Sequence, residues 1–161
     1  SGGEPTIHPD LPDFLKSLKE IGFKVKLDTN GTNYNMLKYL IDQKLVDFVA
    51  MDIKNSPNMY PDTCGVKGLK LDNIIKSINL LKSGVVDYEF RTTLVRDYHT
   101  TQSITEMGKL VKGAKVLYLQ EFVDNGTTIK SGLNEVEKTT ALQFKNILEN
   151  YVDKVFLRGY K

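Results

Sequence analysis

Charged side chains alternate with apolar ones along three short segments that otherwise have the character of buried strands. Their charged and polar members are Lys24, Lys26 and Asp28, then Asp52 and Lys54, then Glu89, Arg91 and Thr93. Successive strand residues point to opposite faces, so each segment places its ionic groups on one face. A charged face indicates either a wide, incomplete barrel that holds a polar ligand or a sheet with one solvated face.

Each of these residues also has an ordinary structural interpretation. Asp28 begins an Asp-Thr-Asn-Gly turn, in which Asp and Asn side chains often bond their own backbone. Asp52 and Lys54 can form an ion pair at a strand end. Arg91 lies in the middle of a strand, where a charge needs an anionic partner, so a functional and a structural role are equally open.

The elements that carry these residues alternate between helix and strand along the chain. The spacing of apolar residues predicts helices over about 11–21, 34–41, 71–81 and 103–111, with a last one after Asn134. Alternation and apolar runs predict strands over 23–28, 47–53, 86–95, 115–122 and 155–158. This order predicts an α/β fold with parallel strands and right-handed crossovers, as a barrel or an open sheet. We expect a single domain over residues 1–161.

Some helix ends have recognisable signals. Asn33 is a suitable cap for the second helix. Ser103 with Glu106 resembles a capping box for the fourth, and Asn134 with Glu137 resembles the start of the last. The stretch 55–70 has no clear periodicity, which predicts a surface loop near the functional end of the strands.

Composition excludes several classes of protein. Lys and Arg number 22 against 20 Asp and Glu, with no run of five like charges, which argues against a nucleic-acid-binding tract. No apolar stretch approaches the length of a membrane span, so we expect a soluble, cytoplasmic protein. Cys64 is the only cysteine, which excludes an internal disulfide and a multi-thiolate metal site built from this chain alone.

Four motifs follow one another at the predicted strand ends, and a fifth lies on a later strand. They are Gly2-Gly3-Glu4-Pro5, Leu27-Asp28-Thr29-Asn30-Gly31, Met51-Asp52-Ile53-Lys54, Phe90-Arg91-Thr92-Thr93 and Leu119-Gln120-Glu121-Phe122. In this order they resemble radical S-adenosylmethionine enzymes, and most closely the activating enzymes of glycyl-radical proteins. Within that group, the activating proteins of anaerobic ribonucleoside-triphosphate reductase are the most similar.

The resemblance implies a partial (β/α)6 TIM-like barrel with parallel strands, of which this chain would lack the first two strands. It implies a [4Fe-4S] cluster that binds S-adenosylmethionine and cleaves it reductively. The 5′-deoxyadenosyl radical would then take a hydrogen atom from a glycine of the partner enzyme. The implied partners are a glycyl-radical enzyme, with anaerobic ribonucleotide reductase the expected one, and an electron donor such as flavodoxin or ferredoxin.

The resemblance also assigns roles to individual residues. The cofactor's methionine amino group would be received by Gly2, Gly3 and Glu4. A monovalent cation beside the cofactor would be bound by Asp28, Thr29 and Asp52. The cofactor carboxylate or the incoming glycine loop would face the catalytic candidates Lys54 and Arg91.

The sequence departs from the family in its cysteines. The family holds its cluster with three closely spaced cysteines, and Cys64 cannot replace them. We therefore expect that this chain alone neither binds the cluster nor turns over S-adenosylmethionine. Missing amino-terminal strands would also leave the strand at 23–28 as an unpaired edge, which predicts self-association. Phe122 lies where some relatives have a histidine near the adenosine.

Three other functions remain open. The chain could belong to an activase of another glycyl-radical enzyme, of the pyruvate formate-lyase type. It could be a cluster-free βα-barrel isomerase or aldolase, although Asp124-Asn125-Gly126 is a poor phosphate cradle. It could also be a non-catalytic module that binds a partner without a cofactor.

Overall fold

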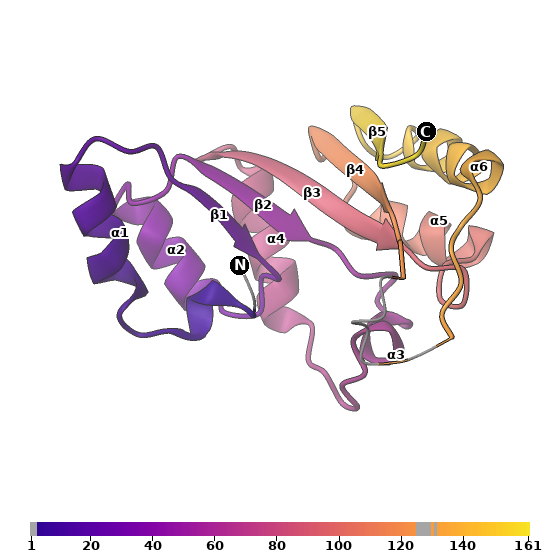
Figure 1. Cartoon of the computed structure of the whole chain (residues 1–161), viewed down its shortest axis with the longest axis horizontal. Helices are drawn as coiled ribbons and strands as arrows, with labels where there is room; N and C mark the ends of the chain where they lie inside the picture. Colours follow the sequence, from indigo (N-terminus) through magenta and orange to yellow (C-terminus); the bar gives the residue numbers. More distant parts are fainter. Residues whose placement is uncertain (1–2, 125–129, 131) are drawn as a thin grey trace. The chain divides into compact units, whose positions relative to one another are not determined.

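Helices and strands alternate along the chain in the computed structural model, which describes residues 3–124, 130 and 132–161 (Figure 1). The elements are η1 (Pro5–Ile7), α1 (Leu11–Glu20), β1 (Lys26–Thr29), α2 (Tyr34–Asp42), β2 (Phe48–Asp52), α3 (Tyr60–Cys64), α4 (Asp72–Lys82), β3 (Asp87–Leu94), α5 (Thr101–Leu110), β4 (Val116–Glu121), α6 (Lys138–Leu148) and β5 (Lys154–Arg158). Within this described part, no helix is both long enough and apolar enough to cross a membrane.

The strands form one parallel sheet in the order β1-β2-β3-β4-β5. Asp28 of β1 lies opposite Ala50 of β2. Arg91 of β3 lies opposite Tyr118 of β4, which in turn lies opposite Phe156 of β5. The predicted α/β class with parallel strands is therefore confirmed.

The chain divides into two compact units. Unit 1 contains the residues up to Asp52 together with Lys70–Glu89, and unit 2 contains Ile53–Leu69 and Phe90–Lys161. Strand β3 thus contributes its first residues to unit 1 and the remainder to unit 2. The expectation of a single domain stays a prediction.

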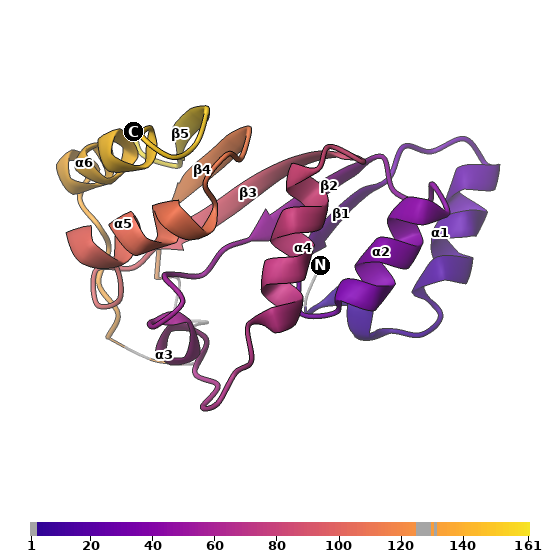
Figure 2. The same ribbon diagram turned by 180° about the vertical axis from the view of Figure 1, so that it is seen from behind.

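In unit 1, α2 and α4 lie on the same face of the strands (Figures 1 and 2). Each helix buries apolar residues at helical spacing, because only one side of an amphipathic helix can face the core. The buried residues are Leu37, Leu40 and Ile41 on α2, Ile74, Ile78 and Leu81 on α4, and Leu27, Val49 and Met51 on the strands. The side chain of Asn33 accepts a hydrogen bond from the N–H of Met36, which confirms the predicted cap.

In unit 2, α5 and α6 contact each other and cover one face of the strands (Figure 2). The buried strand residues alternate along the sequence, and they are Phe90, Thr92 and Leu94 on β3, Leu117 and Leu119 on β4, and Val155 on β5. The residues between them point to the opposite face. The predicted division into an apolar and a polar face is therefore present in the strands of unit 2, whereas β2 of unit 1 buries Val49, Ala50 and Met51 in succession.

Two predicted helix starts were wrong. The capping box of α5 is formed by Thr100 and Ser103, one turn earlier than expected, while Glu106 pairs with Lys109 at 2.7 Å. Helix α6 begins at Lys138 with Glu137 at its N-cap, so of the predicted pair only Asn134 was wrong, and its main-chain N–H donates to the Asp97 carboxylate at 2.7 Å. Both signals were misread because several nearby polar residues can serve as caps.

The prediction of a surface loop over 55–70 was also wrong in part. The segment contains the short helix α3, and its residues Asn55, Ser56 and Tyr60 are all at most 2% exposed. Pro61 occupies the first turn, where its missing N–H costs nothing. A five-residue helix is too short to show an apolar period in the sequence.

Candidate functional site

Glu4 is held at the carboxyl end of β1. Its Oε1 accepts hydrogen bonds from the Thr6 and Thr29 hydroxyls at 2.6 and 2.7 Å and from the Thr6 N–H at 3.2 Å. Its Oε2 accepts from the Asn30 N–H at 2.7 Å. A carboxylate has about four acceptor sites, so Oε2 keeps capacity for another donor. The structure thus brings Glu4 and Thr29 together, and the adjacent Gly3 is exposed.

The turn after β1 requires a glycine at position 31. Gly31 has a φ of 74°, and an added Cβ would lie 2.1 Å from Cε of Met51. The Gly31 N–H donates to the Thr29 hydroxyl, and the Ser77 hydroxyl donates to the Gly31 carbonyl at 2.9 Å. These contacts fix the turn that presents the Asn30 N–H to Glu4.

The charged face predicted for unit 1 is organised around Lys26. Its Nζ lies 3.4 Å from Glu89 and 3.9 Å from Asp28. The same ammonium lies 5.6 Å from the ring centroid of Phe48, within the range of a cation–π contact. Glu89 is almost completely buried, so this lysine supplies a positive charge to a carboxylate that has lost most of its hydration.

The side chains of the three predicted cation ligands do not all share one face. Asp28 is exposed and Thr29 is buried, because neighbouring strand residues point in opposite directions. Asp28 and Asp52 lie on the same face, so Thr29 could join them only through its main chain. Among the described residues, no three His, Cys, Asp or Glu side chains converge to hold a metal ion. Gly2 lies outside the described residues.

Both catalytic candidates lie in unit 2. The carbonyl of Arg91 accepts a hydrogen bond from the Ile53 N–H at 2.8 Å, and the carbonyl of Lys54 lies 3.0 Å from Nε2 of His99. Both residues are partly exposed. Burial raises the pKa of the Cys64 thiol, and the nearby Lys54 ammonium offsets only part of that effect. Cys64 is therefore not an activated thiol.

One polar surface of unit 2 was missed in the sequence. The Arg158 guanidinium lies 3.8 Å above the ring of Tyr118, and the rings of Tyr118 and Phe156 stack with centroids 5.4 Å apart. These side chains share a face with Arg91, as the strand register requires. The alternation of polar and apolar residues in β4 and β5 was the available signal.

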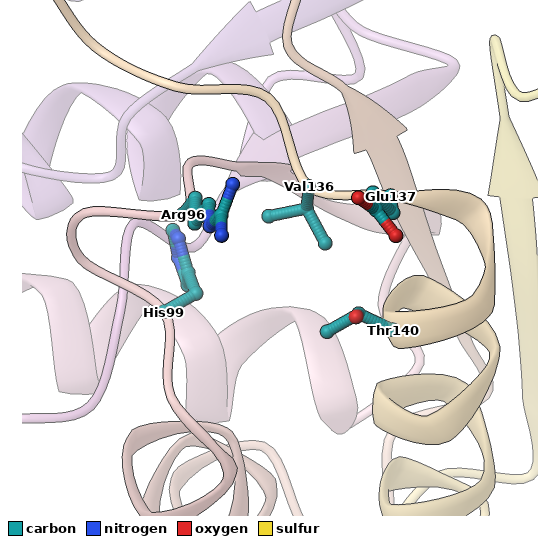
Figure 3. Close-up of a pocket in the computed structure, with 5 residues that line it drawn as sticks. All are labelled: Arg96, His99, Val136, Glu137 and Thr140. Atoms are coloured by element: carbon teal, nitrogen blue, oxygen red, sulfur yellow. The ribbon is translucent and has the colours of Figure 1, made fainter.

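A second missed feature is the burial of His99. Its side chain borders a cavity of about 150 Å³ that is also lined by Arg96, Val136, Glu137 and Thr140 (Figure 3). That volume is below the range of ordinary ligand pockets and is too small for a nucleoside. Burial lowers the pKa of His99 and so favours the neutral imidazole.

Comparisons with known proteins agree on one family. The family model described as the Radical SAM superfamily matches residues 1–111. A protein of Methanocaldococcus jannaschii named as a glycyl-radical enzyme activating enzyme is 34% identical over 98% of this chain, which covers 68% of that protein. A second protein of the same organism and name is 28% identical over 73% of this chain, which covers 43% of it.

The fold also matches a solved structure. A domain of pyruvate-formate lyase-activating enzyme from Bacteroides vulgatus superposes with a TM-score of 0.78, over 99% of this chain and 96% of that domain. Sequence identity between the two is 19%, so the match concerns the fold. It agrees with the expected partial TIM-like barrel.

Proposed function

Since the chain belongs to the Radical SAM superfamily, we propose that the whole protein cleaves S-adenosylmethionine reductively and generates a glycyl radical on a partner enzyme. The resemblance of its motifs favours anaerobic ribonucleoside-triphosphate reductase as that partner. The fold match favours a second candidate, an activase of the pyruvate formate-lyase type. Flavodoxin or ferredoxin would supply the electron, in the cytoplasm.

The observation that carries this proposal is the environment of Glu4. Its carboxylate is fixed at the end of β1 by donors from Thr29 and Asn30 and retains acceptor capacity on Oε2. The main chain of Gly3 beside it is exposed. A carboxylate with an adjacent exposed main chain suits a primary ammonium group, such as that of the methionine part of the cofactor.

The other roles follow the family pattern. Gly2 and Gly3 would bind the same ammonium through their carbonyl groups. Asp28 and Asp52 would bind a monovalent cation through their side chains, with the main chain of Thr29. The cofactor carboxylate or the partner's glycine loop would be bound by Lys54 and Arg91. S-adenosylmethionine, when bound, would supply the 5′-deoxyadenosyl radical.

The residues of this chain do not fit a [4Fe-4S] cluster. Such a cluster needs several thiolates, and Cys64, the only cysteine of the sequence, has a raised pKa. We therefore expect the 161-residue chain alone not to turn over S-adenosylmethionine.

Calorimetric titration of S-adenosylmethionine into the chain tests the proposal. We expect saturable binding, and we expect Glu4→Gln to weaken it about tenfold because a charged acceptor becomes neutral. Glu106→Gln, on α5 in the other unit, is the matched control and should leave the Kd unchanged. Equal affinities for the wild type and Glu4→Gln would contradict the assignment of Glu4.

Two further titrations separate the alternatives. Binding of inorganic phosphate without binding of S-adenosylmethionine would favour the isomerase or aldolase. Binding of a glycyl-radical enzyme by the chain with no affinity for the cofactor would favour a non-catalytic module.

A further inference from the structure

His99 joins two segments that are far apart in the sequence. Its ring is 4% exposed and lies in the loop that follows β3. Nδ1 lies 3.0 Å from both the N–H and the carbonyl oxygen of Val95, and Nε2 lies 3.0 Å from the carbonyl oxygen of Lys54. Both nitrogens are therefore engaged by main-chain atoms.

One neutral tautomer satisfies both nitrogens. Nε2 of His99 faces only an acceptor, the Lys54 carbonyl, whereas Nδ1 faces the N–H as well as the carbonyl of Val95, so a proton on Nε2 allows a hydrogen bond at each nitrogen. In the neutral ring Nδ1 is then an acceptor, and the N–H of Val95 supplies its donor. The histidine thus acts as a rigid bridge between the two main-chain segments.

The residue after Lys54 is held by the same loop. Asn55 is completely buried, and its Nδ2 donates to the carbonyl of Tyr98 at 2.9 Å and to the Thr63 hydroxyl at 3.0 Å. Its Oδ1 accepts from the Ser56 N–H at 2.7 Å. Both polar atoms of the Asn55 side-chain amide are therefore hydrogen-bonded.

The residue before Lys54 is fixed to β3. The Ile53 N–H donates to the carbonyl of Arg91 at 2.8 Å, and the Thr92 hydroxyl donates to the carbonyl of Ile53 at 2.8 Å. Hydrogen bonds consequently hold three consecutive residues, Ile53 and Lys54 through main-chain atoms and Asn55 through its side chain. Lys54, the middle one, has a partly exposed side chain and is bound at its carbonyl by His99.

We propose that His99 is a positioning residue, which fixes the main chain of Lys54 so that its ammonium is presented to the anionic group of a bound ligand. The proposal rests on the proposed function, in which Lys54 faces the carboxylate of S-adenosylmethionine. Ordering a residue on binding costs backbone as well as side-chain entropy, and a main chain that is already fixed removes the backbone part of that cost for Lys54.

A double-mutant cycle tests whether His99 acts through Lys54. The Kd for S-adenosylmethionine is measured for the wild type, His99→Leu, Lys54→Met and the double variant. We expect His99→Leu to raise the Kd about tenfold when Lys54 is present and to leave the Kd unchanged in the Lys54→Met background. An equal loss in both backgrounds would show a general structural role and would overturn the proposal.

A conservative variant provides the rescue. Gln places an amide N–H close to the position of Nε2, so His99→Gln should keep the bond to Lys54 and stay within about threefold of the wild-type Kd. The chain has one other histidine, His8, which is exposed. His8→Leu is the matched control and should leave the Kd unchanged. A His99→Gln variant as weak as His99→Leu would count against the hydrogen bond.

A spectroscopic readout separates this proposal from the proposed function. The carbonyl ¹³C shift of Lys54 and the ring ¹⁵N shifts of His99 report the hydrogen bond without any ligand. We expect the Lys54 shift to change in His99→Leu and to be retained in His99→Gln. If the wild type binds no S-adenosylmethionine, the proposed function is wrong, and the shifts then test by themselves whether His99 holds Lys54. A Lys54 carbonyl shift that is unchanged in His99→Leu would refute the hydrogen bond from His99.

Discussion

Asp47 of unit 1 accepts several charge-assisted hydrogen bonds. Its carboxylate accepts from Nζ of Lys19 at 2.7 and 2.8 Å and from the N–H of Val25 at 2.7 Å, with Nζ of Lys24 at 3.5 Å. The hydrogen bond from Lys19 and then that from Val25 lower the pKa of Asp47 to about 2. One carboxylate thereby ties α1 to the segment that enters β1.

This contact predicts a specific pH dependence of stability. The pKa of Asp47 is about 2 in the folded chain and 3.8 ordinarily, so its contribution is present above pH 4 and is lost as the pH falls from about 4 to about 2. Asp47→Asn should lower the free energy of unfolding at pH 7 by about 1 kcal/mol and make the acid loss shallower. Urea unfolding at pH 7, 4 and 3 measures both effects.

Asp42→Asn is the control for that experiment. Asp42 pairs with Lys38 at 2.6 Å one turn away on α2, and both side chains are about half exposed. Its loss should change stability less than the loss of Asp47, because exposed pairs are screened by water. Identical acid profiles for the wild type and Asp47→Asn would show that the contacts of Asp47 do not couple to folding.

At the scale of the element, α5 depends on a reciprocal cap. The Thr100 hydroxyl accepts from the Ser103 N–H at 3.2 Å, and the Ser103 hydroxyl accepts from the Thr100 N–H at 3.0 Å. Two N–H groups that a helix start leaves without partners are thus satisfied. Helix α5 follows directly from the loop that holds His99, so its first turn also fixes the end of that loop.

We expect Thr100→Ala to destabilise the chain by about 1 kcal/mol, because the N–H of Ser103 loses its acceptor. The control is Thr105→Ala on the same helix, where the hydroxyl donates to the Thr101 carbonyl and caps no helix end. That change should be close to neutral, since Ala has the higher helix propensity. Chemical denaturation of both variants measures the difference, and equal losses would rule out the cap.

Helices and strands were largely predictable, and their ends were not. Apolar residues such as Leu37 and Leu40 signal a helix through local spacing alone, which is why α2 was located correctly. The cap of α5 depends on which of several polar side chains reaches a free N–H, and that is decided by three-dimensional geometry. Helix α3 was not predicted because Tyr60 is its only buried residue, and a single buried residue gives no helical spacing of apolar residues.

At the scale of the whole molecule, the candidate site was predictable where motifs mark strand ends. Glu4 and Thr29 belong to two motifs that were assigned to strand ends, where ligands of such folds bind, and a hydrogen bond of 2.7 Å joins them at the end of β1. His99 and Asn55 could not be found in this way. Their partners are main-chain carbonyls 45 and 43 residues away. Every residue has such a carbonyl, so the sequence does not indicate which one accepts the hydrogen bond.

The same strand order gives β1 an exposed edge. It is the first strand of the sheet, and beside it lies an apolar groove of about 930 Å³ formed by residues of α1, β1 and their flanking segments. Phe14 and Phe23 line the groove and are 60% and 59% exposed. An unpaired strand edge next to exposed aromatic groups favours association with another chain.

We therefore expect the 161-residue chain to self-associate through this groove at high concentration. Replacing both Phe14 and Phe23 by Lys should weaken association at least tenfold, because each buried phenyl group contributes about 2 kcal/mol and the added charges repel. Phe156→Lys, at an exposed phenylalanine of unit 2, is the control and should leave the association constant unchanged. Sedimentation equilibrium over a wide concentration range measures these constants. A wild-type chain that stays monomeric throughout, or a double variant that associates as strongly, would exclude the groove as an interface.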